Sequence, residues 1–434
     1  MQSCGPEWTL EVANLTVKWI VGLIDMQSFY ASVEVATRHA YVRVRTLEKD
    51  DSDPALAVTG DPTRRSGIIL AATPAAKVCG VSTAMRLGEA LRVCPSLVCV
   101  PPRMQLYIDT SVRIHETVRQ TFPKYEPFSV DECFFAFPSP SDLFPNPVQA
   151  AADLRDRIWD QFRIRSRVGL APNKWTAKMA NKAAKKVPGG VLWWRSQADV
   201  LDAIHLLPVT DMWGVKRRAV TLQTELGCST IGDVAKLPMG RLRARLGVWG
   251  DVIHRWANGL DFSDLNADTM SLPHRGYSHR TTLPRDYTCR KEVAVVILEL
   301  LDEVCARARQ AQQKGRRIGL GLTYAGLTGG FYKAKTLPFA SSHSETLYPT
   351  LLELLDGHWN RSGVRAVSVS LDQLGFDDGL QLNLLEDIPR RQALWDTVDQ
   401  VRRDYGETSL MRLSSLLPAG QLRERAHKIG GHTA

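Results

Sequence analysis

The sequence lacks the features that mark several protein classes. No apolar run approaches the roughly 18 residues that a membrane-spanning helix needs. The first residues carry Glu7 and Glu11 in place of a basic leader and an apolar stretch. The eight cysteines include no C-x-x-C pair, and no histidine stands at zinc-ligand spacing from a cysteine pair. We therefore expect a cytoplasmic protein with no membrane partner, zinc site or disulfide bond.

A large apolar fraction and an excess of positive charge are present instead. Hydrophobic residues make up 44 % of the 434 residues, which is enough to build a core and excludes a disordered chain. The length suits about three compact units. Lysine and arginine number 55 against 46 aspartates and glutamates, a net charge of +9. This excess favours a polyanionic partner, but it does not by itself separate DNA from a membrane surface.

The hydrophobic patterns predict an α/β (α+β) multidomain fold. An apolar run at 17–24 is typical of a buried strand and stops at Asp25, and Ser28 then stands at the N-cap of a helix. Residues 1–16 show no clear periodicity, and we interpret them as a leader. Later patterns predict helices at 29–40, 102–121, 148–162, from 173 and at 389–405, extended segments at 127–137 and 165–171, and short helices over 198–257.

The region 276–373 has its own pattern. It predicts a strand, a long helix, two strands, a second helix and a final strand. This β-α-β-β-α-β order is that of a split βαβ sandwich.

Carboxylates in apolar surroundings mark two places. Asp25 ends the first strand, and Asp131-Glu132 interrupts the run FSV…CFFAF. Buried carboxylates are costly unless they are paired or bind a metal, and three of them suit two divalent cations in phosphoryl transfer. Neighbouring strand residues point to opposite faces, so Asp131 and Glu132 can share a site only at a turn or bulge. Spacing alone leaves open a metal site and surface turn carboxylates.

Three segments resemble motifs of the Y-family translesion DNA polymerases. They are LIDMQSFYASVE at 23–34, FSVDECFF at 128–135 and APNKWTAKMANKAAKK at 171–186. Their order and separation agree with the family, and the resemblance runs from about residue 20 to beyond 400. The branch resembles the UmuC-like enzymes, and GDPTRRSGIILAATPAAK together with the ending AHKIGGH indicates the form found in Gram-positive bacteria.

The resemblance implies a right-hand polymerase. Its parts would be a leader (1–16), a palm (17–38 and 101–187), fingers (39–100), a helical thumb with a helix-hairpin-helix (188–262), a linker (263–275), a split-βαβ little finger (276–373) and a C-terminal tail (374–434).

The resemblance also implies the chemistry. Asp25, Asp131 and Glu132 would be catalytic and would hold two Mg²⁺ ions, with Mn²⁺ as an alternative, and the Met26 carbonyl would be a further ligand. A primer 3′-hydroxyl would attack the α-phosphate of a deoxynucleoside triphosphate, and pyrophosphate would leave.

Three residues match family positions around the nucleotide. Tyr30 matches the steric gate beneath the sugar, and Lys77 and Lys185 match lysines that contact the triphosphate. Without the motifs, Tyr30 would be read as a core tyrosine and the two lysines as solvated.

Further positions concern DNA and protein partners. Trp213-Gly214-Val215-Lys216 resembles a helix-hairpin-helix turn, with Gly214 and Lys216 as phosphate contacts, and a plain helical hairpin is the alternative. Arg280, Lys333 and Lys335 are candidate phosphate contacts of the little finger, although each could simply be solvated.

A peptide after the little finger resembles the motif by which bacterial polymerases dock on the sliding clamp. It comprises Gln381, Leu382, Leu384 and Leu385, the last in place of phenylalanine, and a packing strand is the alternative. A UmuD-like accessory subunit or a recombinase filament is left open as a further partner.

The function expected from all of this is low-fidelity, template-directed translesion DNA synthesis during the DNA damage (SOS) response. The alternative is a DNA- and clamp-binding damage-tolerance factor with little polymerase activity unless a partner subunit is present. A metal-dependent nuclease is a third hypothesis, which lacks a motif of its own.

Overall fold

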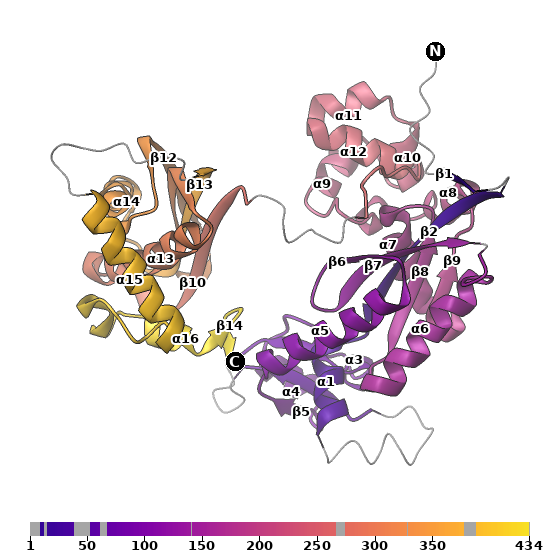
Figure 1. Ribbon diagram of the computed structural model, residues 1–434, viewed down its shortest axis with the longest axis horizontal. Coiled ribbons are helices and arrows are strands. Elements are labelled where there is room, and N and C mark those ends of the chain that lie inside the picture. The colour runs from indigo at the N-terminus through magenta and orange to yellow at the C-terminus, as the bar shows by residue number, and fades with distance from the viewer. Residues whose placement is uncertain are drawn as a thin grey trace. The chain divides into compact units, whose positions relative to one another are not determined.

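The computed structural model describes residues 9–12, 15–38, 53–60, 67–139, 141–265, 274–327, 329–376 and 388–433. The chain divides into two compact units, Met1–Ser271 and Leu272–Ala434 (Figure 1). Within the described ranges, no helix is both long and apolar enough to cross a membrane.

The palm is built on a six-stranded sheet in the order β6-β7-β2-β8-β9, with β1 paired to the start of β2. The central strand β2 has antiparallel neighbours on both sides, so Leu23 and Ile24 are fully buried. The strands are β1 (Thr9–Val12), β2 (Leu15–Met26), β6 (Lys124–Pro127), β7 (Glu132–Ser139), β8 (Ser166–Ala171) and β9 (Val191–Trp193).

The interpretation of residues 1–16 as a leader is wrong in part. Strand β1 pairs antiparallel with the first residues of β2, from Thr9 opposite Lys18 to Val12 opposite Leu15. A strand of four residues is too short to show a periodicity in the sequence. The predicted buried strand is confirmed, but it begins at Leu15 and ends at Met26.

Helices cover this sheet. Helix α7 begins after Asn173, which forms a capping box with Thr176. It lies so close to β8 that a Cβ on Gly169 would come within 2.1 Å of the Asn181 backbone nitrogen. The palm helices are α1 (Phe29–Thr37), α5 (Met104–Thr121), α6 (Pro147–Phe162) and α7 (Lys174–Ala183), followed by the 3₁₀ turns η2 (Ala184–Lys186) and η3 (Pro188–Gly190).

The fingers form a small layer of their own. Their three strands run in the order β4-β3-β5 and enclose a core that includes Ala57, Ile69 and Leu87. The described elements are β3 (Leu56–Thr59), β4 (Ile69–Ala72), α3 (Pro74–Val78), α4 (Leu87–Val93) and β5 (Val98–Val100).

The thumb shares a hydrophobic core with the palm helix α7. Trp175 of α7 stacks on Trp256 of the thumb with 5.9 Å between ring centroids, and Trp213 packs against the same cluster. This common core joins the two parts into one unit. The thumb elements are α8 (Gln197–Ile204), η4 (Val209–Asp211), α9 (Arg218–Thr224), α10 (Ile231–Lys236), α11 (Met239–Leu246) and α12 (Val248–Ala257).

The little finger is the split βαβ sandwich that the sequence predicts. Its sheet has the order β10-β13-β11-β12, and helices α13 and α14 share a hydrophobic core with it (Figure 1). The elements are β10 (Gly276–Tyr287), α13 (Arg290–Gln310), β11 (Gln313–Tyr324), β12 (Gly330–Ser341), α14 (Ser344–His358) and β13 (Val364–Phe376), with the turn η6 (Ala325–Leu327) after β11.

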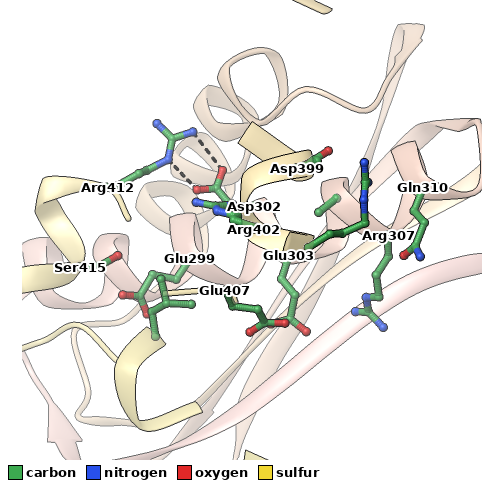
Figure 2. A pocket seen from close by; sticks show the side chains of 13 residues that line it. Glu299, Asp302, Glu303, Arg307, Gln310, Asp399, Arg402, Glu407, Arg412 and Ser415 are labelled. Atoms are coloured by element: carbon green, nitrogen blue, oxygen red, sulfur yellow. Dashed lines mark hydrogen bonds and ion pairs between the residues drawn. The ribbon is translucent and has the colours of Figure 1, made fainter. Parts of the chain in front are cut away.

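The described part of the C-terminal tail packs on the little finger. Arg412 donates to both carboxylate oxygens of Asp302 on α13, at 2.6 and 3.0 Å (Figure 2). Arg309 of α13 makes a similar pair with Asp399, and Ala419 is buried in the little-finger core. The elements are α15 (Ile388–Tyr405), η7 (Leu413–Leu416), α16 (Leu422–Ala426), β14 (Lys428–Ile429) and β15 (His432–Thr433).

Candidate active site

The palm sheet places three charged residues side by side on neighbouring strands. Asp25 at the end of β2 stands opposite Glu132 on β7 and opposite Arg167 on β8. Residues directly opposite one another in neighbouring strands point to the same face of a sheet. The strand register therefore brings two carboxylates and one guanidinium to the same surface.

Asp131 lies in the turn just before β7. The Phe128 and Ser129 backbone amides both donate to the Glu132 carbonyl, at 3.1 and 3.0 Å, and this closes the turn. The Met26 amide donates to the Asp131 carbonyl at 2.9 Å, so the turn is tied to the end of β2. The turn that Asp131 and Glu132 would need to share a site is therefore present.

Two cations compensate these carboxylates. Arg167 donates to Asp25 Oδ2 at 2.6 Å, and Lys178 of α7 forms an ion pair with Glu132. Sequence analysis missed both. A usable signal for Arg167 is a charged residue directly before the apolar end of the strand predicted at 165–171, whereas Lys178 resembles any other lysine on a helix.

Burial disfavours the charged forms of the Asp25 and Glu132 carboxyl groups. It raises the pKa of Asp25, an effect that Arg167 opposes and that the nearby Asp131 reinforces. Burial likewise raises the pKa of Glu132, with Lys178 opposing and with Asp25 and Asp131 adding to the rise. Asp131 is thus close enough to act on both other carboxylates, and the three share one electrostatic environment.

The donor chemistry fits a hard divalent cation. Three carboxylates are oxygen ligands of the kind that Mg²⁺ prefers. The Met26 side chain is buried, which leaves its backbone carbonyl as the group that could coordinate. Among the described residues, no three carboxylate, imidazole or thiol groups converge as a metal cluster, and Arg167 and Lys178 pair with two of these carboxylates.

Tyr30 lies at the start of α1 beside these acids. Its ring stacks on that of Tyr107, and its pKa is raised by burial and by the charge of Asp131. The neighbouring Phe29 is buried in the core, as packing requires. A side chain that excludes a nucleotide's 2′-hydroxyl would have to lie next to the carboxylates, and the Tyr30 ring has this position.

Lys77 and Lys185 come together from different parts of the chain. Thr73 caps the short helix α3, which carries Lys77, and Lys185 lies in the turn η2. Burial lowers the pKa of Lys77, and the positive charges of Lys185 and Arg167 lower it further. These three cations therefore form one positive surface next to Asp25.

Ser28 does not cap helix α1 with its side chain, although it stands at the N-cap position. It stands at the N-cap of α1, but its φ is +49° and its side chain makes no capping hydrogen bond. The hydroxyl instead accepts a hydrogen bond from Lys77 Nζ at 2.7 Å. Ser28 thus links the fingers to the palm.

Comparisons with known proteins identify the family of this chain. Models of the impB/mucB/samB family and of its C-terminal domain match residues 24–182 and 274–384. DNA polymerase IV 2 of Bacillus subtilis (strain 168) is 36 % identical over 417 residues, which cover 95 % of this chain and 98 % of that protein. The chain belongs to the Y family of translesion DNA polymerases.

Other comparisons agree with this membership. DNA polymerase IV of Pelotomaculum thermopropionicum is 37 % identical to this Y-family polymerase over 405 residues, 93 % of this chain and 97 % of that protein. The fold matches the solved Y-family DNA polymerase chimera Dbh-Dpo4(243-245)-Dbh with a TM-score of 0.62, 23 % identity, and coverage of 82 % of this chain and 99 % of that one. The prediction of a DNA-directed DNA polymerase is confirmed, and the binding-factor alternative is not favoured.

The helix-hairpin-helix turn of the Y-family polymerase has the predicted tight bend. Gly214 has a φ of +90°, and a Cβ there would come within 2.8 Å of the Trp256 ring, so only glycine fits. Lys216 is exposed beside it. The turn lies between the 3₁₀ turn η4 and the seven-residue helix α9, so the element before it is shorter than the helix that we expected.

The three basic candidates of the little finger lie on two different faces of its sheet. Arg280 donates to Thr323 on the face that carries no helix, whereas Lys335 pairs with Glu353 of α14 on the other face. Lys333, two residues before Lys335, shares the helix-covered side because strand side chains alternate. Arg317, which sequence analysis missed, alternates with the buried Ile318 and so joins Arg280 on the open face.

The clamp peptide with Gln381, Leu382, Leu384 and Leu385 lies outside the described residues.

Proposed function

We propose that this polymerase extends primers by two-metal phosphoryl transfer at Asp25, Asp131 and Glu132. The template directs nucleotide choice, fidelity is low, and damaged bases are bypassed during the DNA damage response. The observation that carries the mechanism is the placement of two carboxylates abreast in the sheet with the third in the adjoining turn.

The metal part of the proposal rests on the donor set. Asp25, Asp131 and Glu132 would hold two Mg²⁺ ions, or Mn²⁺, with the Met26 carbonyl as a further ligand. Bound ions of this kind neutralise developing charge and clamp the attacking and leaving oxygens. Metal dependence is common to the family, and the identity and number of the ions are our proposal.

The surrounding side chains position the substrate. Lys77 and Lys185 attract the triphosphate through the positive potential that they share with Arg167. The Tyr30 ring closes the space beneath the sugar. Arg167 and Lys178 hold the side chains of Asp25 and Glu132 in place, so little reorganisation is needed when the substrate arrives.

DNA binding is proposed through phosphate contacts. Gly214 and Lys216 in the thumb, and Arg280 on the open face of the little finger, would contact the backbone of a primer-template. Lys333 and Lys335 stay candidates only for contacts along the edge strand β12, because Lys335 is already paired with Glu353. Contacts to phosphates do not depend on the base sequence, and a polymerase needs binding of this kind because it must act on any template.

The proposed clamp contact rests on the sequence motif alone. Leu382, Leu384 and Leu385 would be apolar anchors in a groove of the sliding clamp, and the Gln381 amide would hydrogen-bond to it. A requirement for a UmuD-like subunit or a recombinase filament is a separate question, which activity of the purified chain decides.

Primer extension tests the proposed function. The purified chain is incubated with primer-template DNA and deoxynucleotides in magnesium, manganese or a chelator, with and without a sliding clamp. We expect extension with either metal, none in the chelator, and stimulation by the clamp. Absence of extension with both metals, while DNA is still bound, would favour dependence on a partner subunit and overturn the proposal for the isolated chain.

A further inference from the structure

A hollow of about 530 Å³ lies in the palm beside the carboxylate site. Residues of β8, helix α6 and the turns η2 and η3 line it, and it includes Arg167 and Lys185 but not Lys77. Its volume falls within the usual range for small-molecule pockets, about 300–1,000 Å³. The hollow thus adjoins the proposed triphosphate site through two shared cations and continues beyond it toward α6.

The charge of the hollow is strongly positive. Arg155, Arg165, Arg167 and Lys185 line it together with a single carboxylate, that of Asp156. Asp156 forms an ion pair with Arg155 at 3.5 Å, which solvent weakens because the Asp156 side chain is 69 % exposed. Arg167 is paired with Asp25 and Arg155 lies beside Asp156, and Lys185 adds a further positive charge, so the lining favours an anion.

Two buried donors of the lining are unused. Ser166 Oγ and Arg167 Nε are buried and have no hydrogen-bond partner within the part of the chain that the structure describes. Ser166 as a whole is 5 % exposed. Buried polar groups are almost always hydrogen-bonded, so two orphaned donors in one basic hollow indicate that an acceptor belongs there.

Two consecutive glycines form part of the wall. Gly189 and Gly190 have φ values of +78° and +66°, a conformation that other residues rarely adopt. A Cβ on Gly189 would come within 3.7 Å of Arg155 Nη1, and one on Gly190 within 3.4 Å of the Arg167 Cγ. Both distances are ordinary van der Waals contacts, so the backbone conformation and not crowding favours glycine at this wall.

We propose that this hollow is a second phosphate site, which binds inorganic pyrophosphate. The proposal rests on the polymerase function, because Arg167 and Lys185 join the hollow to the site where pyrophosphate is formed. Lys77 and Lys185 would hold the triphosphate for reaction, and Arg155, Arg165 and the Ser166 hydroxyl would receive the pyrophosphate afterwards. Charge-assisted hydrogen bonds from arginines suit an anion with several oxygens.

Calorimetry on the metal-free protein tests this without any catalytic activity. Inorganic pyrophosphate is titrated into Lys77→Ala, which weakens the triphosphate site, and then into Lys77→Ala/Arg155→Gln. We expect the first variant to keep one pyrophosphate site and the second to bind about tenfold more weakly or worse, since one charge-assisted contact is lost. Failure of primer extension would count against the polymerase proposal alone.

Matched variants complete the test. Arg157 lies on the same helix as Arg155 but is exposed and outside the hollow. Arg157→Gln should therefore leave pyrophosphate binding unchanged. Arg155→Lys keeps the charge and should restore most of the affinity, which also shows that the position tolerates substitution.

Two results would overturn the proposal. One is equal pyrophosphate binding by Lys77→Ala with and without Arg155→Gln. The other is a loss of primer-template affinity in Arg155→Gln with no change in pyrophosphate binding, which would assign the hollow to DNA.

Discussion

The rings of Tyr30 and Tyr107 lie nearly parallel, with 4.5 Å between their centroids and 16° between their planes. Tyr107 is fully buried on α5, and its hydroxyl donates to Glu34 Oε1 at 2.7 Å. Glu34 also accepts hydrogen bonds from Arg38 and Arg103. Tyr30, which matches the steric gate, therefore stacks on the buried Tyr107 ring, and the hydrogen bond to Glu34 holds that ring in place.

The first prediction concerns choice of sugar. Tyr30→Ala should relax discrimination against ribonucleotides while some deoxynucleotide insertion remains. Removing a wall against one extra heavy atom should change the ratio of insertion efficiencies by about 10–200-fold. The ratio is measured from single-nucleotide insertion of each sugar. Tyr30→Phe keeps the ring and should keep the ratio, so an unchanged ratio in Tyr30→Ala would exclude Tyr30 as the gate.

The second prediction concerns the support beneath the gate. Tyr107→Phe removes one hydrogen bond to the charged Glu34 and should lower the free energy of unfolding by about 1.5–3 kcal/mol. It should leave the sugar ratio unchanged, because the stacked ring remains. Tyr107→Ala removes the ring and should reduce discrimination as well as stability. Equal sugar ratios in both variants would mean that Tyr107 does not position Tyr30.

The third prediction concerns pH. Burial acts to raise the pKa of Glu34, but hydrogen bonds from Arg103, Tyr107 and Arg38 outweigh it and lower that pKa below its usual value. A carboxyl with a lowered folded-state pKa stabilises the fold above its unfolded pKa of about 4.3 and loses this contribution as pH falls through the folded-state value.

Thermal unfolding of the wild type and of Glu34→Gln across pH 3–7 checks this. Glu34→Gln should be less stable at neutral pH, and the difference should shrink as the pH falls below about 4.3. A difference that does not depend on pH would show that the charge of Glu34 is not what stabilises the cluster.

The fourth prediction concerns the metal carboxylates. Asp131→Ala should lower primer extension by at least about a hundredfold, because a preorganised charge at the reacting centre is lost. Primer-template binding should remain. Magnesium should stabilise the wild type against heat, by about 2.7 kcal/mol at 100 times its dissociation constant, and this effect should be much weaker in Asp131→Ala. Equal magnesium stabilisation of both proteins would remove Asp131 from the metal site.

The fifth prediction concerns the grip on DNA. Affinity for primer-template should fall steeply with salt and depend little on sequence, because the contacts are to phosphates. Arg280→Ala should reduce the slope of log K against log salt by about 0.9, the contribution of one phosphate contact. Lys335→Ala should change the slope less, since Lys335 is paired with Glu353 on the other face of the sheet. A larger slope change for Lys335→Ala than for Arg280→Ala would show that the DNA contacts the helix-covered side and not the open face.

Local patterns in the sequence were sufficient for most of the element order and for the family motifs. Strand and helix periods, together with caps such as Thr73 and Asn173, depend on residues close in the chain. The β-α-β-β-α-β order of the little finger is confirmed for the same reason. The requirement for a turn at Asp131 also follows from local geometry, because neighbouring strand residues face opposite ways.

Only the tertiary structure decided which groups compensate the palm carboxylates Asp25 and Glu132 and which basic residues share a face. Arg167 meets Asp25 across 142 positions of the chain, and Lys178 meets Glu132 across 46. Lys335 proved to lie toward α14, away from Arg280. These relationships depend on the order and register of strands that are distant in sequence, and no local period encodes which strands become neighbours.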